Sequence, residues 1–456
     1  MAFNSLTFVA LLLPTLIAYW ISRNQQVRLV LLCVASLVFY GFYHWVGVIL
    51  LLISIPANYA MGRMQMSHRS ARLLAFVVVV NLLPLCWFKY IAFVAENVNT
   101  MLVLSGVSLS VPRPEVFLPL GISFITFQVI AYQIDIYRGE IQAERSLLRF
   151  AVFKFFFPQL VAGPIVRAKE FLPQLYQPIS FDAEIFHQGL WLVFAGLFLK
   201  IGVADILAQF ADKAFAAPSE LTTVGAWTGL YAYSVQLFAD FWGYSTMAVG
   251  LAALFGLKLP MNFDAPYFST SLQEFWRRWH ITLSHWFRDY VYIPLGGNRK
   301  RQLFNLLATM ALVGLWHGAG WTFVIWGVMH GLWLSAERAF VSAGETAGRM
   351  ARVAKTVLVF HGVCLLWVVF RAPTIHVAVE YYQRLLLPPF TAEAVPSVLF
   401  WWLFLFAVAH RPLTWSLKEA RFVRLPLPLQ WGLALGCWYF IVVYAGAKLN
   451  FIYFSF

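Results

Sequence analysis

Charged residues are scarce in this sequence. Only 12% of its 456 residues are Asp, Glu, Lys or Arg, whereas 61% are hydrophobic. Water-soluble globular domains carry about 25% charged residues, so this composition excludes an ordinary soluble protein. The chain also has no low-complexity segment, no detectable internal repeat and no stretch polar enough for a separate soluble domain. We therefore expect one integral-membrane domain that covers residues 1–456.

Metal-binding and disulfide patterns are missing as well. His280 and His285 are five residues apart with no glutamate between them, unlike the zinc-protease pattern. The chain has four cysteines, all within apolar runs, and none forms a CxxC pair or lies near a histidine at metal-ligand spacing. These are Cys33, Cys86, Cys364 and Cys437. We interpret them as packing residues and expect no metal site.

Several common catalytic and targeting motifs are absent. The turn at Gly296-Gly297-Asn298 lacks the GxxxxGK[ST] spacing of a phosphate-binding loop, so it gives no support to an ATP-driven function. No GxSxG motif of serine hydrolases occurs. The first apolar run lacks a basic n-region and continues into further spans, so we expect the first helix to be retained.

Basic residues are in excess, with a formal net charge of +13. They occur in short clusters between apolar runs and not on one continuous stripe, which argues against nucleic acid as a partner. Membrane topology and anionic membrane lipids explain these clusters better. Clusters at 23–28 and 63–72 indicate cytoplasmic links, which places the N-terminus outside.

The apolar runs predict a polytopic all-α protein with about 12 transmembrane helices plus re-entrant or interfacial helices. Each run is close to the roughly 20 residues that a bilayer crossing requires. The run within 150–177 is broken by Pro158, Gly163 and Pro164, which indicates a re-entrant or broken helix packed within protein. The run from Trp227 to Phe255 is long enough to hold two segments joined near Asp240.

A charged, aromatic segment, FWRRWHITLSHWFRDYVYIPLGGNRKR, interrupts these runs at 275–301. Ionisable groups at membrane depth are expensive and usually mark function. Its arginines and tryptophans predict an amphipathic, interfacial or re-entrant helix that holds an anionic cofactor through Arg277 and Arg278. An anchor for lipid headgroups explains the same composition equally well.

His317 lies in the apolar segment that follows, LFNLLATMALVGLWHGAGWTFVIWGVMHG, and a second histidine follows at His330. A histidine that only hydrogen-bonds a neighbouring helix is the plainer alternative. However, Trp316 precedes His317, and the glycines at 314, 318 and 320 would let backbone or ligand approach closely. A neutral imidazole in this place could take a proton from an acceptor hydroxyl.

Two further polar features belong to the predicted site. Asp240, in QLFADFWGYS, is a carboxylate at membrane depth, and an ion pair with an arginine of 277–288 explains it at least as well as catalysis. After the turn at Asn298, the residues Arg299, Lys300 and Arg301 form a basic cluster that we expect on the cytoplasmic face.

Several of these motifs together resemble the membrane-bound O-acyltransferase (MBOAT) family. The motifs are QLFADFWGYSTMAVGLAALFG, FWRRWHITLSHWFRDYVYIPLGGNRK, LVGLWHGAGWTFVIWGVMHG, FFPQLVAGPIVR and the terminal FIYFSF. The resemblance runs through most of the chain, is densest at 235–331, and is strongest to the bacterial polysaccharide branch that includes the alginate O-acetylation membrane subunit.

The resemblance implies a set of tilted helices around a central tunnel, with the acyl donor arriving from the cytoplasm and the acceptor from outside. It places the family's invariant histidine at His317 and a second, more variable polar position at His280. It gives supporting roles to Asp240, Asn298 and Trp316. Donor binding would fall to Arg277, Arg278 and the 299–301 cluster.

The function that this resemblance implies is transfer of acetyl groups across the bacterial inner membrane for O-acetylation of an exported polysaccharide. Acetyl-CoA would be the donor and no cofactor would be bound permanently. A separate periplasmic acetyltransferase would complete the reaction. Lipid or protein O-acyltransferases would share the chemistry of His317, and a transporter would show paired broken helices, which this sequence lacks.

Overall fold

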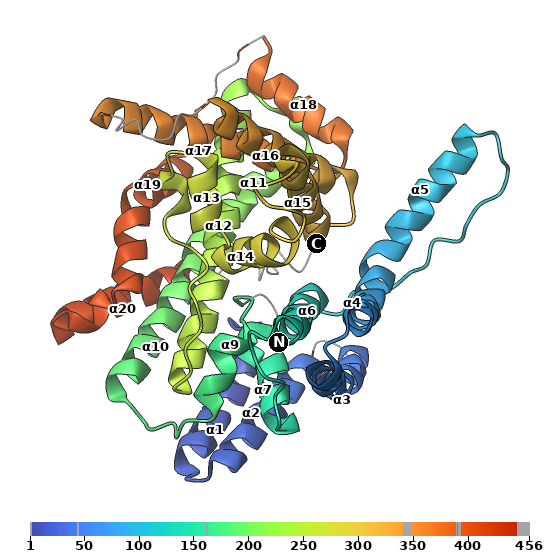
Figure 1. Ribbon diagram of the computed structural model, residues 1–456. Helices are drawn as coiled ribbons and strands as arrows, with labels where there is room; N and C mark the ends of the chain where they lie inside the picture. The colour runs from blue at the N-terminus through green and yellow to red at the C-terminus, as the bar shows by residue number, and fades with distance from the viewer. Residues whose placement is uncertain are drawn as a thin grey trace. The chain divides into compact units, whose positions relative to one another are not determined.

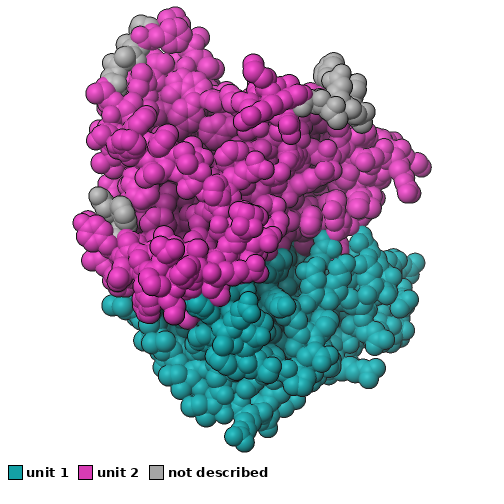
Figure 2. All heavy atoms as spheres, turned by 90° about the vertical axis from the view of Figure 1, so that its left-hand side faces the viewer, with its two compact units in different colours: residues 1–189, 248–260 teal, residues 190–247, 261–456 magenta. Residues whose placement is uncertain are grey.

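The computed structural model describes residues 2–42, 45–160, 163–340, 348–388, 390 and 394–444, and the terminal FIYFSF motif lies outside these ranges. Every regular element in the described residues is a helix, which confirms the predicted all-α class (Figure 1). Two compact units are distinguished, in different colours in Figure 2. Unit 1 comprises Met1–Gly189 and Ala248–Pro260, and unit 2 comprises Leu190–Met247 and Met261–Phe456.

Within the described residues, six helices are long and apolar enough to cross a bilayer. They span Trp45–His68, Ala71–Leu104, Ala183–Ala216, Thr223–Leu254, Arg349–Arg371 and Ser397–Lys418. Four shorter apolar helices accompany them, at Leu6–Ile21, Gln25–Gly41, Gln302–His317 and Leu427–Val443. The chain is therefore a multi-pass membrane protein, and the number of about 12 crossings stays a prediction.

Unit 1 is built mainly from the N-terminal helices. These are α1 (Leu6–Ile21), α2 (Gln25–Gly41), α3 (Trp45–His68), α4 (Ala71–Leu85), η1 (Cys86–Tyr90), α5 (Ile91–Leu104) and α6 (Ile122–Arg138). Polar N-caps begin several of them: Ser5 accepts from the backbone N–H of Phe8, and Asn24 from that of Gln26. Helix α6 packs against both α3 and α4. Helices α3, α4 and α6 therefore pack together in unit 1.

The interrupted run in 150–177 forms a chain of short, buried helices, as its proline and glycine content predicts. It comprises α7 (Leu147–Phe155), α8 (Phe157–Leu160), α9 (Ala168–Phe171) and η2 (Leu172–Leu175). Phe153 and Phe156 are fully buried. Helix α7 packs against α2, α3 and α6, so the broken backbone is enclosed by protein.

Unit 2 contains most of the C-terminal elements. They are α10 (Ala183–Leu197), η3 (Phe198–Ala204), α11 (Asp205–Ala216), η4 (Pro218–Glu220), α12 (Thr223–Leu254), η5 (Pro266–Phe268), α13 (Leu272–Arg278), α14 (Ile281–Phe287), η6 (Arg288–Tyr292), α15 (Gln302–His317), α16 (Trp321–Phe340), α17 (Arg349–Arg371), α18 (Ile375–Leu386), α19 (Ser397–Lys418), η7 (Arg421–Arg424) and α20 (Leu427–Tyr444). By the division above, α10 begins and α12 ends within unit 1.

Helix α12 corrects one expectation from the sequence. The run from Trp227 to Phe255 does not hold two segments, because α12 is one continuous helix of 32 residues. It is buried over 89% of its most apolar window, so it is a core helix and not a lipid-facing one. Gly243 does not break it. Instead, a Cβ on Gly243 would lie 2.7 Å from the carbonyl oxygen of Gly196, so the glycines allow α10 and α12 to touch backbone to backbone.

The charged segment also differs from the single amphipathic helix that its composition suggests. It forms two seven-residue helices, α13 and α14, separated by Trp279 and His280. His280 has φ +44°, in the left-handed region that L residues rarely adopt. Helical periodicity gave no signal for this reversal, because the motif WRRWH contains neither glycine nor proline.

Candidate functional site

His317 is the last residue of α15, at the closed end of a helical hairpin formed with α16. Gly318 follows in an extended conformation and its N–H donates to the carbonyl of Gly314, which ends the helix. The His317 side chain is only 3% exposed, so the hairpin turn holds the imidazole within unit 2.

The glycines around His317 allow α16 to approach α15 closely. A Cβ on Gly314 would lie 2.1 Å from the carbonyl oxygen of Phe323, and one on Gly318 would lie 2.1 Å from the Phe323 ring. The space next to these glycines is therefore filled by α16. Of the two alternatives that we expected, close approach of backbone is therefore present at Gly314, and at Gly318 the space is taken by the Phe323 ring and not by a ligand.

Aromatic rings surround the His317 imidazole. Its centroid lies 4.9 Å from that of Trp316, 5.3 Å from that of Trp326 and 5.3 Å from that of Phe370, and all three contacts are edge-on. Aromatic pairs at these distances favour edge-to-face geometry and restrict the orientation of both rings. The imidazole is therefore held in one position by helices α15, α16 and α17.

His280 lies near His317, with Trp316 as a shared neighbour. Its ring centroid is 4.6 Å from that of Phe241 and 5.8 Å from that of Trp316, and its side chain is fully buried. The N–H of Ile281 donates to the carbonyl of Asn262 at 3.0 Å, which fixes the turn. Burial lowers the pKa of His280 to about 3, so this imidazole is neutral near pH 7.

His330 belongs to the same cluster of buried side chains as His317 and His280. It is fully buried, with its ring 4.7 Å from that of Trp326 and 5.2 Å from that of Trp276. Within the described residues neither of its ring nitrogens has a hydrogen-bond partner. Trp326 therefore contacts both His317 and His330, a link between two histidines that the sequence places 13 residues apart.

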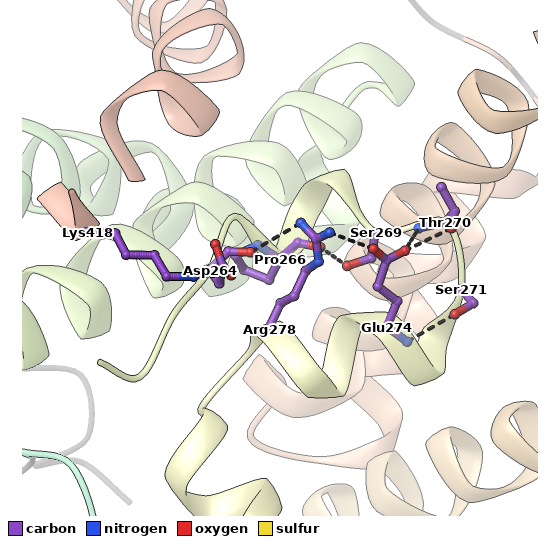
Figure 3. A network of polar contacts seen from close by, with 8 residues as sticks. All are labelled: Asp264, Pro266, Ser269, Thr270, Ser271, Glu274, Arg278 and Lys418. Atoms are coloured by element: carbon purple, nitrogen blue, oxygen red, sulfur yellow. Dashed lines mark hydrogen bonds and ion pairs between the residues drawn. The ribbon is translucent and has the colours of Figure 1, made fainter. Parts of the chain in front are cut away.

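A polar network fixes α13, as Figure 3 shows. Arg278 donates to Glu274 at 2.6 Å and to the carbonyl of Asp264 at 3.4 Å, while Lys418 pairs with the Asp264 carboxylate at 3.0 Å. Asp264 N–H in turn donates to the carbonyl of Arg278. Arg278 thus has partners within the protein, and it is not among the residues that line the cavity described below.

The N-terminus of α13 is capped on two sides. The Ser271 hydroxyl accepts from the N–H of Glu274, and the Glu337 carboxylate of α16 accepts from the N–H of Leu272 at 2.6 Å. Glu274 itself accepts from the N–H and hydroxyl of Thr270. Burial alone would raise the pKa of Glu274, but these bonds and the Arg278 charge together hold it below its ordinary value.

A cavity of about 410 Å³ opens beside this cluster. Val313 lines it, one helical turn before His317 on α15, and Trp276 lines it next to His330. His280, His317 and His330 are not among the residues that line the cavity, but its lining residue Trp276 contacts His330. The remaining apolar wall consists of Leu283, Phe287, Ile293, Leu306, Met310 and Leu334.

The other wall of the cavity is polar and basic. It carries Gln273, Arg277, Ser284, His285, Arg288, Tyr292, Asn298 and Arg338. Arg338 donates to Tyr292 at 2.9 Å and to Asn298 at 2.8 Å, which are neutral partners. Arg288 pairs with Asp289. Arg277 has no ion pair in the part of the chain that the structure describes, so at least two cationic groups face the cavity without a carboxylate of their own.

The basic residues at 299–301 do not line the cavity, although the neighbouring Asn298 does. All four residues are exposed, but of these only Asn298 lines the cavity, where it accepts from Arg338. The predicted turn is present, with φ +117° at Gly296 and +55° at Gly297. Sequence reasoning missed Arg338, because its position 40 residues after Asn298 on α16 carries no local signal.

Asp240 belongs to a second polar centre in unit 2. Lys200 pairs with Asp240 at 2.8 Å and with Asp205 at 2.7 Å, and the ammonium and Asp240 are almost fully buried. We expected an arginine partner, but the ammonium of η3 fills that role. Lys200 lies four residues after Gly196 and Asp240 three before Gly243, so the backbone contact of these glycines brings the two charges together.

No group of three or more His, Cys, Asp or Glu side chains within the described residues is arranged to hold a metal ion. The cavity instead offers a ligand both apolar and cationic lining side chains, beside a buried histidine cluster that Trp276 contacts. A donor with an anionic head and an acyl group has this chemistry.

Comparison with known proteins identifies relatives of this chain. The model of the MBOAT family, membrane-bound O-acyltransferases, matches residues 140–370. The probable alginate O-acetylase AlgI of Pseudomonas aeruginosa is 41% identical over 394 residues, 84% of this chain and 75% of the relative. The peptidoglycan O-acetyltransferase of Helicobacter pylori is 36% identical over 417 residues, 83% and 78% of the two chains.

A more distant relative, the teichoic acid D-alanyltransferase of Bacillus subtilis, is 28% identical over 274 residues, which cover 56% of this chain and 69% of the relative. The family match includes every residue of the histidine cluster and the cavity described above. The helices, the membrane-spanning segments and these matches agree. This chain therefore belongs to the membrane-bound O-acyltransferase family and is an O-acyltransferase.

Proposed function

We propose that this protein transfers acetyl groups across the bacterial inner membrane for O-acetylation of an exported polysaccharide, with acetyl-CoA as the cytoplasmic donor. The observation that carries the proposal is the cavity of about 410 Å³, which is lined by arginines and apolar side chains and whose lining residue Trp276 contacts His330 of the histidine cluster. Two of the relatives are an alginate O-acetylase and a peptidoglycan O-acetyltransferase, which supports acetyl as the group and a polysaccharide as the acceptor.

The basic wall suits the phosphates of a coenzyme. Guanidinium groups bind phosphate through paired N–H donors, and Arg277 and Arg338 both line the cavity. The apolar lining residues suit the uncharged pantetheine arm and the acetyl group. The exposed cluster at 299–301 supplies a positive field that attracts the anion before it binds.

His317 is the group that we assign to the chemistry. As general base, its imidazole takes the proton from the acceptor hydroxyl while the hydroxyl oxygen attacks the thioester carbonyl carbon. The carbon–sulfur bond breaks, and the imidazolium returns the proton to the thiolate sulfur. As a nucleophile it would instead carry the acetyl group on a ring nitrogen before transfer. Both routes need a neutral imidazole in a fixed orientation, which the aromatic contacts provide.

The other site residues have supporting roles in this proposal. His280 shares Trp316 with His317, and Trp316 orients both rings. Asn298 orients Arg338 on the cavity wall. Asp240 stabilises the packing of α12 through Lys200. The acetyl group then passes to a periplasmic acetyltransferase partner that modifies the polysaccharide.

Inverted inner-membrane vesicles test the proposal, because their outer surface corresponds to the cytoplasm. Acetyl-CoA labelled in the acetyl group is supplied outside, and label is measured in polysaccharide, protein and phospholipid within the vesicles. We expect label in polysaccharide, together with a labelled periplasmic protein, and none with His317→Gln. Label that accumulates in phospholipid would instead establish the lipid acyltransferase, and label confined to other proteins the protein acyltransferase.

A further inference from the structure

A second cavity, of about 170 Å³, lies within unit 1, where α3, α4, α6 and α7 meet. Its wall is mostly apolar and includes Leu50, Leu51, Val80, Ile122, Ile125 and Val129. Ile53 on α3 also lines it and is 63% exposed. Helix α3 is long and apolar enough to span the bilayer, so the cavity opens on the lipid-facing surface.

A buried ammonium lies on the inner wall of this cavity. Lys154 of α7 lines the cavity, is fully buried and donates to the hydroxyl of Ser54. Among the residues that the structure describes, this hydroxyl is its one hydrogen-bond partner, and no carboxylate pairs with it. An ammonium has three N–H donors, and a charge buried without a counter-ion is strongly unfavourable, so burial lowers the pKa of Lys154 to about 7. A carboxylate bound in the cavity would pair with the ammonium form and stabilise it.

The neighbouring polar groups of unit 1 do not supply that counter-ion. Asn58 and Asn81 exchange two side-chain hydrogen bonds of 2.9 Å, and Gln133 donates to the carbonyl of Asn58. The amide of Asn58 also donates to Ser54, so the hydroxyl that accepts from Lys154 is already shared. Asn58 and Asn81 therefore bind each other, and neither they nor Gln133 carries a negative charge that could pair with Lys154.

We propose that this cavity binds a free fatty acid, with its carboxylate on Lys154 and its chain directed between α3 and α4 toward the bilayer. One buried ammonium balances one carboxylate. The cavity is similar in size to one of roughly 150 Å³ that holds benzene, so it suits a carboxyl group and a few methylenes but not a glycerophospholipid headgroup. The apolar wall suits the chain, and the exposed Ile53 marks where it leaves.

This site is separate from the acyl-transfer site and does not depend on the function proposed above. All of its residues belong to unit 1, whereas the histidine cluster and the larger cavity belong to unit 2. Fatty-acid binding can therefore be measured without donor or acceptor.

Photolabelling of the purified full-length protein in nanodiscs tests the proposal. The probe is decanoate with a photoreactive diazirine, and unlabelled decanoate, decanol and phosphatidylglycerol are the competitors. We expect saturable labelling of peptides from 45–68 and 122–138, with decanoate competing at least about tenfold better than decanol, since a charge-assisted hydrogen bond contributes about that factor. Equal competition by decanol, or stronger competition by phosphatidylglycerol, would overturn the proposal.

Three variants test whether the carboxylate of the fatty acid binds at Lys154. Lys154→Met should weaken decanoate binding about 10- to 100-fold. The matched control is Lys169→Met, because Lys169 is an exposed lysine that pairs with Glu140, and it should bind as the wild type does. Ala57→Trp keeps the ammonium but fills the cavity that Ala57 lines, so it should abolish saturable labelling. If Lys154→Met fails to assemble, Ala57→Trp decides alone: unchanged saturable labelling in that variant rejects the site.

Discussion

The imidazole of His317 meets the indole of Trp326 edge to face, with 5.3 Å between ring centroids and 89° between ring planes. The same indole contacts His330 at 4.7 Å, and Trp276 connects His330 to the lining of the larger cavity. Because the rings are in mutual contact, the position of His317 depends on residues from α13, α15 and α16 together.

The first prediction concerns His317. His317→Gln preserves most of the side-chain volume among Trp316, Trp326 and Phe370 but cannot take a proton near neutral pH. We expect acetyl transfer to fall about 100- to 10,000-fold, because that is the usual contribution of a general base. The measurement is labelled acetyl transfer in inverted vesicles at matched protein levels.

His410→Gln is the matched control for this substitution. His410 is also buried among aromatic rings, 4.8 Å from Phe238, but it lies on α19 and has no assigned role. It should keep near-normal activity if the loss at His317 is chemical. His317→Ala is less informative than sequence alone suggests, since the packed surroundings would leave a cavity. Substantial activity in His317→Gln would reduce His317 to a structural role and direct attention to His280 and His330.

The second prediction separates cavity arginines from surface ones. Arg277→Gln and Arg338→Gln should each weaken acetyl-CoA binding about tenfold or more, because both guanidinium groups line the cavity. Neutral substitutions at 299–301 should have a smaller effect that disappears at high salt, because those side chains are exposed and act at long range. Isothermal titration at low and high salt measures both. Donor affinity that is the same in all variants would support a lipid-anchoring role for these residues.

The third prediction concerns the pH dependence of the α13 cap. The pKa of Glu274 lies below its ordinary value of 4.5, so its ionised form stabilises the folded state. This stabilisation is fully present above pH about 4.5 and is lost as the pH falls through the lower, folded pKa. Glu274→Gln should therefore lower the melting temperature at pH 7 and lower it progressively less in acid. Glu140→Gln, which removes an exposed carboxylate with only long ion pairs, is the control and should change little.

The fourth prediction concerns the buried ion pairs of η3 and α12. Lys200→Met leaves Asp205 and Asp240 without their shared cation and should destabilise the protein by about 3–5 kcal/mol. Asp212→Asn is the control, because it breaks a half-exposed ion pair with Arg371 and should contribute at most about 1 kcal/mol. Thermal unfolding and the amount of protein in the membrane report both effects. Equal losses of stability in the two variants would show that the buried ion pairs of Lys200 stabilise the protein no more than the half-exposed pair does.

The fifth prediction concerns topology. A cysteine at Arg69 should react with an impermeant reagent only from the cytoplasm, whereas one at Ser108, beyond the 34-residue helix Ala71–Leu104, should react only from the periplasm. The assay needs a background without Cys86, which is exposed in the structure. Periplasmic labelling at Arg69 would reverse the orientation.

The sequence alone determined the class and the family of this protein. Scarcity of charge and long apolar runs require helices, because unpaired backbone groups are not tolerated in lipid. Prolines and glycines in 150–177 correctly predicted a broken, buried helix. His317 and His280 were identifiable as candidates, since histidines are unusual in such runs, and the motifs around them indicated the family that the comparisons then showed.

Only the tertiary structure decided which side chains meet. Arg277 and Arg278 are adjacent in sequence, yet one lines the cavity and the other pairs with Glu274, because a helix directs successive side chains to different faces. Lys200 pairs with Asp240, and Arg338 donates to Asn298, although the two partners are 40 residues apart in the sequence in each case. Such partners depend on how helices pack. Periodicity along one helix records which face is apolar, but it contains no information about which other helix covers that face.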